Sequence, residues 1–331
     1  MDPHTAGLWA VLARWSDRLD PRPLVRSVSG DLTRLAPAEL RRAGCSAGLV
    51  RRWSQAEPLS EPPWAVVGQD HYPAPLLDLP RPPPALWLQG RPSALDGSAL
   101  AVVGSRACTP YGRRMARALG QAIATAGGVV VSGGARGIDT EAHLGACQVG
   151  PSVAVLGAGL LAPVGREGRR VRDRLLAADG ALISELPPHD PPTRWTFPRR
   201  NRLIAALGRV TVVVEAGLRS GAGITARLAG ELGRDVYAVP GPVGAPASAG
   251  CLRLLRDGAL VVEDIHTVSS LVAPAQGGPS HALLDALTAP LAPGELAERL
   301  GQPMAETLHR LVLMELSGLV RRDPVGRYVR A

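Results

Sequence analysis

Glycine and arginine occur together in two segments that follow short apolar runs. The first is Val102 to Arg106 (V-V-G-S-R), and the second is Ser132 to Asp139 (S-G-G-A-R-G-I-D). Glycine lets the backbone approach a ligand closely, and the planar fork of arginine makes paired hydrogen bonds to a phosphate. Both segments therefore indicate anion-binding loops, although a tight turn also favours glycine. The candidate residues are Gly104, Ser105, Arg106, Gly133, Arg136 and Gly137.

A third segment, Ser220 to Thr225 (S-G-A-G-I-T), combines glycines with the start of a predicted helix. The first backbone N–H groups of a helix have no partner within it and can donate to a bound anion. Gly221 and Thr225 are therefore added to the candidate site.

The hexapeptide Phe197 to Arg202 (F-P-R-R-N-R) contains both the single Phe and the single Asn of the chain. Its three arginines supply several guanidinium forks, and its Phe, like the nearby Trp195, has a face on which bases can stack. The alternative interpretation is a helix start with exposed arginines and a buried Phe. The candidate residues are Phe197, Arg199, Arg200, Asn201 and Arg202.

A dinucleotide site is a competing interpretation. Gly157, Gly159 and Ala162 match the pattern G-x-G-x-x-A after an apolar run, and Glu185 ends the next run. Pro163 and the loop after it delay the following helix, however. The glycines therefore do not open that helix, and a pyrophosphate would miss the helix dipole.

Support for catalysis is slight. Ser105 has no base beside it in sequence, and histidines such as His71 and His143 are more often structural than basic catalysts. Asp139 and Glu215 are expected to pair with the arginines. The four cysteines are scattered, with no metal-ligand spacing. We therefore expect no catalytic residue, no metal and no cofactor. The runner-up is a nucleotide hydrolase or phosphoribohydrolase with Glu215 as its acid or base.

The elements that must position these loops alternate between strands and helices. Short apolar runs rich in valine predict strands at 100–103, 129–132, 152–156, 181–184, 210–214, 235–239 and 260–262. Helical stretches between them lie at 112–126, 140–148, 166–178, 199–207 and 224–232. This alternation predicts a doubly wound, mainly parallel α/β sheet of the Rossmann-like type, whose ligands bind at the carboxyl ends of the strands.

Two smaller regions flank the predicted sheet. Residues 7–55 have helical periodicity, with Leu8, Leu12, Trp15 and Leu19 on one stripe and two short helices between Pro37 and Trp53. Proline-rich joints follow at 58–63 and 80–84. After a flexible linker come helical segments at 283–289, 293–300 and 304–316 and a basic hairpin at 321–330, the order of a winged helix-turn-helix. The predicted domains are 1–60, 61–272 and 281–331, with the linker at 273–280.

Charge and hydropathy narrow the class of partner. The net charge is +8, and residues 99–280 alone carry +7, from twenty Arg against thirteen acids. Residues 281–331 balance at six against six, which disfavours a third hypothesis, a duplex-binding regulator led by the winged helix. No apolar run is long enough to span a bilayer and no leader pattern opens the chain, so we expect a cytoplasmic protein without membrane contact.

These segments together closely resemble the DNA-processing protein A (DprA/Smf) family of bacteria, and the resemblance covers nearly the whole chain. The motifs that carry it are H-Y-P at 71–73, V-V-G-S-R at 102–106, S-G-G-A-R-G-I-D at 132–139 with His143, Ser184-Glu185, F-P-R-R-N-R at 197–202, V-V-E-A at 213–216, S-G-A-G-I-T at 220–225, G-R-D-V-Y-A-V-P-G at 233–241 and Gly258-Ala259.

The resemblance implies an amino-terminal helical domain like the sterile alpha motif, an extended Rossmann-like domain and a small winged-helix domain. It also implies binding of incoming single-stranded DNA during natural transformation, homodimerisation through the Rossmann-like domain, and loading of the RecA recombinase. Three positions depart from the family's pattern, namely Gly134 in place of Leu, Pro163 without a preceding Tyr, and Cys251 in place of Asn. The role of the carboxy-terminal domain is left open.

Overall fold

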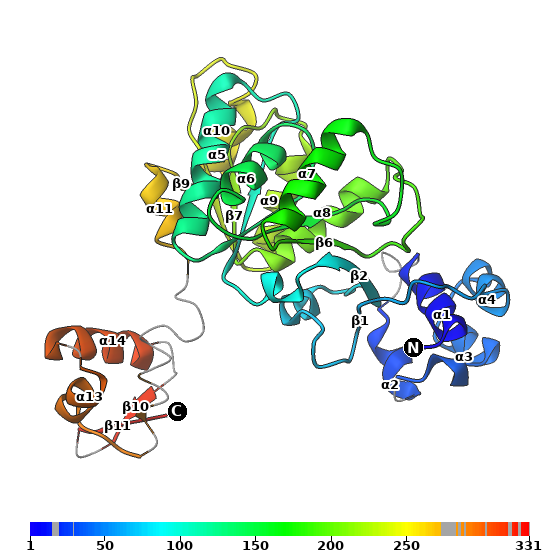
Figure 1. Ribbon diagram of the computed structural model, residues 1–331, viewed down its shortest axis with the longest axis horizontal. Helices are drawn as coiled ribbons and strands as arrows, with labels where there is room; N and C mark the ends of the chain where they lie inside the picture. Colours follow the sequence, from blue (N-terminus) through cyan, green and yellow to red (C-terminus); the bar gives the residue numbers. More distant parts are fainter. Residues whose placement is uncertain are drawn as a thin grey trace. The chain divides into compact units, whose positions relative to one another are not determined.

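A nine-stranded sheet is built from strands between residues 65 and 261, and Figure 1 shows the helices that surround it. The computed structural model describes residues 1–14, 20–28, 30–272, 283, 286–287, 289–301, 303–316, 320–323 and 326–330. The chain divides into two compact units, Met1–Val272 and Ala273–Ala331. The predicted linker at 273–280 lies outside the described residues.

The strand order of the sheet is β1-β2-β6-β5-β4-β3-β7-β8-β9. The strands are β1 (Ala65–Val66), β2 (Ala85–Gly90), β3 (Ala99–Val103), β4 (Val129–Ser132), β5 (Ser152–Val155), β6 (Ala181–Ser184), β7 (Val210–Val213), β8 (Asp235–Ala238) and β9 (Leu260–Val261). Strands β3 to β9 pair in parallel, whereas β1 and β2 are antiparallel additions at one edge. The α/β fold with a mainly parallel sheet is thus confirmed. The two extra strands escaped prediction because one is very short and the other follows a proline run.

Helices cover both faces of the sheet. They are α5 (Pro110–Thr125), α6 (Ile138–Ala146), α7 (Arg166–Ala177), α8 (Thr196–Leu207), α9 (Gly221–Glu231), α10 (Ala249–Arg256) and α11 (Ile265–Ser269). Side chains of β3 alternate between the faces, as a pleated strand requires. Val102 belongs to the core cluster that contains Leu119 of α5. Val103 belongs to the cluster that contains Leu203 of α8.

The order of the parallel strands reverses beside β3. Strands β3, β4, β5 and β6 follow one another outward in one direction, and the chain then returns to place β7 on the other side of β3. Loops that leave β3 and β7 therefore diverge, which opens a crevice at the carboxyl ends of these strands. The loops 104–109 and 214–220 flank this crevice.

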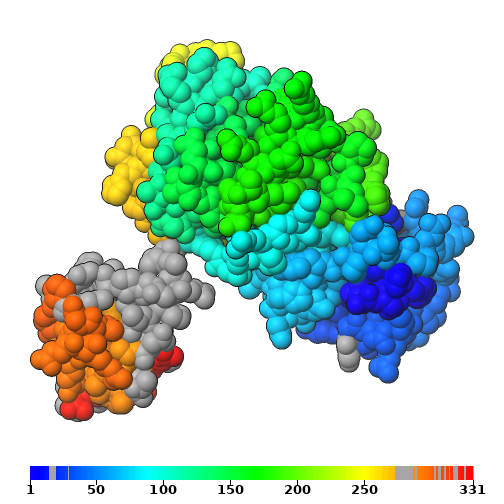
Figure 2. All heavy atoms as spheres, in the orientation of Figure 1, coloured from blue at the N-terminus to red at the C-terminus, as the bar shows by residue number. Residues whose placement is uncertain are grey.

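Residues 1–60 form a helical segment that belongs to the first unit. Its elements are α1 (Pro3–Ala13), α2 (Arg22–Ser27), a 3₁₀ turn (Leu32–Arg34), α3 (Pro37–Arg42) and α4 (Ala47–Ser54). Every residue from Ala6 to Ala13 is buried, so α1 is enclosed on all sides rather than along one stripe. Trp15 and Leu19 of the predicted stripe lie outside the described residues. Figure 2 shows residues 1–60 (blue) continuous with the segment that follows (cyan).

The second unit contains α13 (Pro293–Leu300), α14 (Met304–Leu316) and an antiparallel pair formed by β10 (Val320–Arg322) and β11 (Tyr328–Arg330). Leu296, Leu311 and Tyr328 are among its buried core residues. Both helices and the hairpin match their predicted positions. Of the predicted segment 283–289, only four residues are described, and the assignment as a winged helix stays a prediction.

Candidate nucleic-acid interface

A pocket of about 600 Å³ lies at the carboxyl ends of β3 and β7. Eight of the thirteen predicted site residues line it, namely Gly104, Ser105, Arg106, Phe197, Arg200, Asn201, Gly221 and Thr225. They come from the loop after β3, from α8 and from the start of α9. The crevice at the reversal of strand order therefore gathers residues from segments more than 100 positions apart in the chain.

The exposed guanidinium of Arg106 lies over the ring of Phe197, 5.1 Å from its centroid. An arginine over an aromatic face is attracted by the ring quadrupole, and it keeps its edge N–H donors available to other groups. Arg136, which is also exposed, donates from Nε to the carbonyl oxygen of Arg106 at 3.4 Å. Arg136 does not line the pocket itself, but this contact places it beside the Arg106 loop.

Arg200 forms the floor of the pocket and is only 3% exposed. Burial lowers the pKa of Arg200 to about 10, so the side chain stays charged at neutral pH, and the buried carboxylate of Asp139 supports that charge. Burial likewise raises the pKa of Asp139, and the charge of Arg200 opposes that rise. These two buried groups give the pocket a polar floor, and its cation, Arg200, does not extend into solvent.

Two predicted glycines serve the internal packing of the loops. A Cβ on Gly133 would lie 2.0 Å from Nη1 of Arg200, so only glycine lets the buried guanidinium pass. Gly137 has a φ of +92°, and a Cβ there would lie 2.3 Å from the carbonyl oxygen of Ser105. Neither residue lines the pocket. Gly133 therefore leaves room for Arg200, and Gly137 lets the loops after β3 and β4 pack against each other.

The start of α9 closes the pocket opposite Arg106. Ser220 caps the helix by accepting a hydrogen bond from the N–H of Gly223 at 3.3 Å. Asn201 donates from Nδ2 to the carbonyl oxygen of Gly221 at 3.3 Å, which joins α8 to α9. Thr225 is buried, and its hydroxyl donates back to the same carbonyl at 3.4 Å. The single Asn of the chain is therefore a clamp between the two helices that form this wall.

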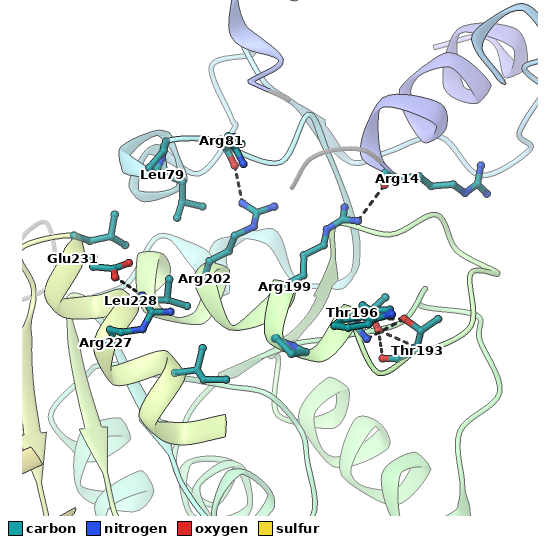
Figure 3. A pocket seen from close by; sticks show the side chains of 15 residues that line it. Arg14, Leu79, Arg81, Thr193, Thr196, Arg199, Arg202, Arg227, Leu228 and Glu231 are labelled. Atoms are coloured by element: carbon teal, nitrogen blue, oxygen red, sulfur yellow. Dashed lines mark hydrogen bonds and ion pairs between the residues drawn. The ribbon is translucent and has the colours of Figure 1, made fainter. Parts of the chain in front are cut away.

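Arg199 and Arg202 differ from expectation, because they do not line the pocket and instead extend from α8 toward Arg14 and Arg81 (Figure 3). Both pair with the buried carboxylate of Glu185, Arg199 at 3.2 Å. Arg199 also donates to the carbonyl oxygen of Arg14, and Arg202 donates to that of Arg81. The three arginines of the hexapeptide thus do not present their guanidinium groups on one surface. Arg199 and Arg202 are three residues apart and share a helix face, whereas Arg200 lies on another face.

Arg194 was absent from the predicted site, yet it lines the pocket beside Phe197 and is exposed. It precedes Phe197 by three residues, so the sequence signal was a cation next to the hexapeptide. The exposed cations at the pocket are therefore Arg106 and Arg194, with Arg136 beside the Arg106 loop and the buried Arg200 beneath them.

Glu215 does not reach the pocket, which weakens the hydrolase hypothesis. Its carboxylate accepts from the backbone N–H of Thr109 at 2.9 Å and from the Thr109 hydroxyl at 2.5 Å. A Cβ on Gly112 would lie 2.4 Å from the same carboxylate. Glu215 is therefore buried against the start of α5, where its negative charge complements the helix dipole.

The dinucleotide pattern at 157–162 also has another explanation. A Cβ on Gly157 would lie 2.9 Å from the ring of Phe197, and one on Gly159 would lie 2.1 Å from the carbonyl oxygen of Pro187. These glycines face the chain itself, and α7 begins only at Arg166. Among the described residues, no cluster of three or more candidate ligands could hold a metal ion. No described helix has the length and apolarity needed to cross a bilayer.

Residues 64–273 match the sequence model of a family described as DNA recombination-mediator protein A, and this range spans more than half of the chain. The chain belongs to the DNA recombination-mediator protein A (DprA/Smf) family. The resemblance drawn from the motifs is thereby confirmed.

Individual members of the DprA family agree with this assignment. The chain is 41% identical to protein Smf of Escherichia coli K12 over 282 residues, which cover 79% of this chain and 75% of that protein. The crystal structure of DprA from Streptococcus pneumoniae superposes with a TM-score of 0.72 at 32% identity, covering 81% of this chain and 96% of that one.

A second solved member is the DprA of Helicobacter pylori, a protein described as having a unique single-stranded DNA-binding mode. Its TM-score is 0.57 at 29% identity, and the match covers 61% of this chain and 94% of that one. The family is thus one of DNA recombination mediators, and at least one member binds single-stranded DNA.

Proposed function

We propose that this DprA-family chain grips single-stranded DNA in the pocket around Arg106 without catalysing a reaction on it. The observation that carries this proposal is the Arg106–Phe197 pair at the mouth of the pocket, flanked by exposed Arg136 and Arg194. Guanidinium groups bind phosphates, and an adjacent aromatic ring offers a face to an unstacked base. A duplex keeps its bases stacked inward, so this combination favours a single strand.

The roles of the remaining predicted residues follow from their contacts. Gly104, Ser105, Asn201, Gly221 and Thr225 shape the walls around the strand, and Arg200 supplies a fixed positive charge below it. Gly133 leaves room for the Arg200 guanidinium, and Gly137 holds the loops after β3 and β4 together. Arg199 and Arg202 act on the strand through the position of α8, since their own guanidinium groups face Glu185.

We further propose that the bound strand is incoming DNA in natural transformation and that the protein protects it and loads RecA in the cytoplasm. Recombination mediation is the description of the family. We also propose a homodimer through the Rossmann-like domain. Leu260 and Val261 of edge strand β9 are 45% and 39% exposed, and an unpaired edge with apolar side chains suits a second copy of the chain.

Fluorescence anisotropy with a labelled oligothymidylate tests the binding proposal. Arg106→Ala and Arg194→Ala should each weaken binding about tenfold or more, and each should make log Kd less dependent on log salt by about 0.7 per lost phosphate contact. Arg209→Ala is the matched control, because Arg209 is exposed at the opposite, amino end of β7. Wild-type affinity in both pocket variants would refute the proposal.

The hydrolase alternative is tested separately with nucleoside monophosphates. Release of free base by the wild type, and its loss in Glu215→Gln, would replace the binding proposal with an enzymatic one. We expect no release, because the Glu215 carboxylate is occupied by Thr109.

A further inference from the structure

Trp195 is the most exposed of the aromatic side chains described, at 69%, and it is the N-cap residue directly before α8. The guanidinium of Arg194 lies over its ring, 4.6 Å from the centroid. The same kind of pair, Arg106 over Phe197, occurs two residues further along the chain. The start of α8 therefore carries two arginine–aromatic pairs in succession.

Only the second of these pairs belongs to the pocket already described. Arg194 lines the pocket, but Trp195 lines a neighbouring groove of about 1030 Å³ between α8, α9 and residues 79–81. Pro198 and Ile224 line both cavities. The pocket and the groove thus adjoin across these two residues, and Arg194 and Trp195 lie on either side of the boundary.

The lining of the groove favours a nucleic-acid strand over an acid-rich or neutral partner. Five arginines line it against one acid, Glu231. Arg227 pairs with Glu231, Arg14 with Asp190, and Arg199 and Arg202 both with Glu185, so the five arginines of the groove face three carboxylates among the described residues. Leu228 and Leu232 supply an apolar wall suited to base faces. Figure 3 shows Arg227, Leu228 and Glu231 at the groove, and Arg199 and Arg202 extend there from α8 toward the segments of Arg14 and Arg81.

We propose that Trp195 is a second base-stacking platform, placed where a single strand leaves the Arg106 pocket over Pro198 and enters the groove. This inference rests on the proposed function, because the strand must first be held in the pocket. Base stacking on an exposed indole tolerates any sequence, since every base has a π-face. The platform therefore adds length-dependent affinity without adding sequence preference.

The test compares oligothymidylates of about 4 nucleotides, which fill the pocket alone, with ones of about 12 nucleotides, which reach the groove. Trp195→Ala should weaken binding of the longer oligomer at least fivefold and leave binding of the shorter one unchanged. Trp195→Phe should restore most of the affinity, because a phenyl ring still stacks. Val149→Ala is the control, as Val149 is 50% exposed just before the amino end of β5, whereas the pocket lies at the carboxyl ends of the parallel strands.

Tryptophan emission gives a second readout that mere stabilisation of α8 would not produce. The longer oligomer should quench the emission of the wild type and of Val149→Ala, and this quenching should largely disappear in Trp195→Phe although binding persists. Trp9, Trp53 and Trp87 are buried and should contribute little to it.

Three results would overturn the platform: equal affinity of the wild type for both lengths, no effect of Trp195→Ala at either length, or equal weakening at both lengths. None of these touches the proposed function, which is judged by Arg106→Ala on the shorter oligomer. If Arg106→Ala loses binding of the shorter oligomer and Trp195→Ala has no effect, the proposed binding pocket stands and the proposed stacking role of Trp195 is refuted.

Discussion

Arg199 and Glu185 form an ion pair that is almost completely buried, with Nη2 and Oε2 at 3.2 Å and side-chain exposures of 12% and 2%. Arg202 shares the same carboxylate. Glu185 follows β6, whereas both arginines belong to α8, whose opposite side carries Phe197 and Arg200. One carboxylate behind the helix therefore fixes the helix that forms the pocket wall.

Glu185→Gln should lower the free energy of unfolding by about 3 kcal/mol, because two largely buried guanidinium groups lose the negative charge of the carboxylate that they share. Urea unfolding measures this change. Asp190→Asn is the matched control: Asp190 accepts two hydrogen bonds from Arg14 at 2.8 Å, but that pair is 39% and 23% exposed and should contribute about 1 kcal/mol or less. Equal losses in the two variants would contradict the role assigned to Glu185.

Gly133→Ala should weaken single-strand binding about tenfold while the protein still folds, because the new Cβ displaces the buried guanidinium of Arg200 from the pocket floor. Anisotropy titration and the urea midpoint measure the two effects. Gly150→Ala is the control, since its Cβ would meet only ordinary contacts at 3.7 Å and beyond. Unchanged affinity in Gly133→Ala would show that the strand does not depend on the position of Arg200.

His143 should make the fold less stable as the pH falls below about 6.5. Burial lowers the pKa of His143 to about 3, so the unfolded chain binds a proton there between the two values and the folded chain does not. Stability is therefore fully present above the unfolded pKa and is lost progressively toward pH 3. The expected loss from this residue between pH 7 and pH 5 is about 2 kcal/mol.

Urea unfolding at several pH values checks this dependence, with His143→Gln as the comparison. The variant should lose less stability between pH 7 and pH 5 than the wild type does, whatever its absolute stability. Both proteins contain Ser152, whose Oγ lies 2.7 Å from Nδ1 of His143 in the wild type. The substitution changes this hydrogen bond in the variant only. Parallel pH profiles would show that another group is responsible.

The sheet could be predicted because its strands are buried on both faces and read as continuous apolar runs. The loops after β3 and β4 were recognised for a related reason: glycine and arginine there interrupt apolar sequence where parallel strands end. The short strand β1 and the antiparallel β2 had no such signal. Val66 and Trp87 take their strand character from pairing with distant residues rather than from local pattern.

The candidate site was predicted in composition but not in orientation. The prediction began the helix at Arg199, whereas α8 begins at Thr196. With the earlier start, Phe197, Arg200 and Asn201 have the spacing i, i+3, i+4 of one helix face, and Arg199 and Arg202 have the spacing i, i+3 of another. Helical geometry then separates the two groups.

The sequence by itself therefore determined which residues occur at the strand ends and that they suit a phosphate chain, because residue type and local period are properties of the chain alone. Only the tertiary structure decided which arginines meet solvent and which meet Glu185. That choice depends on partners supplied by other strands and loops, and an arginine's hydrogen-bonding capacity is satisfied equally by a phosphate or by a carboxylate of the protein itself.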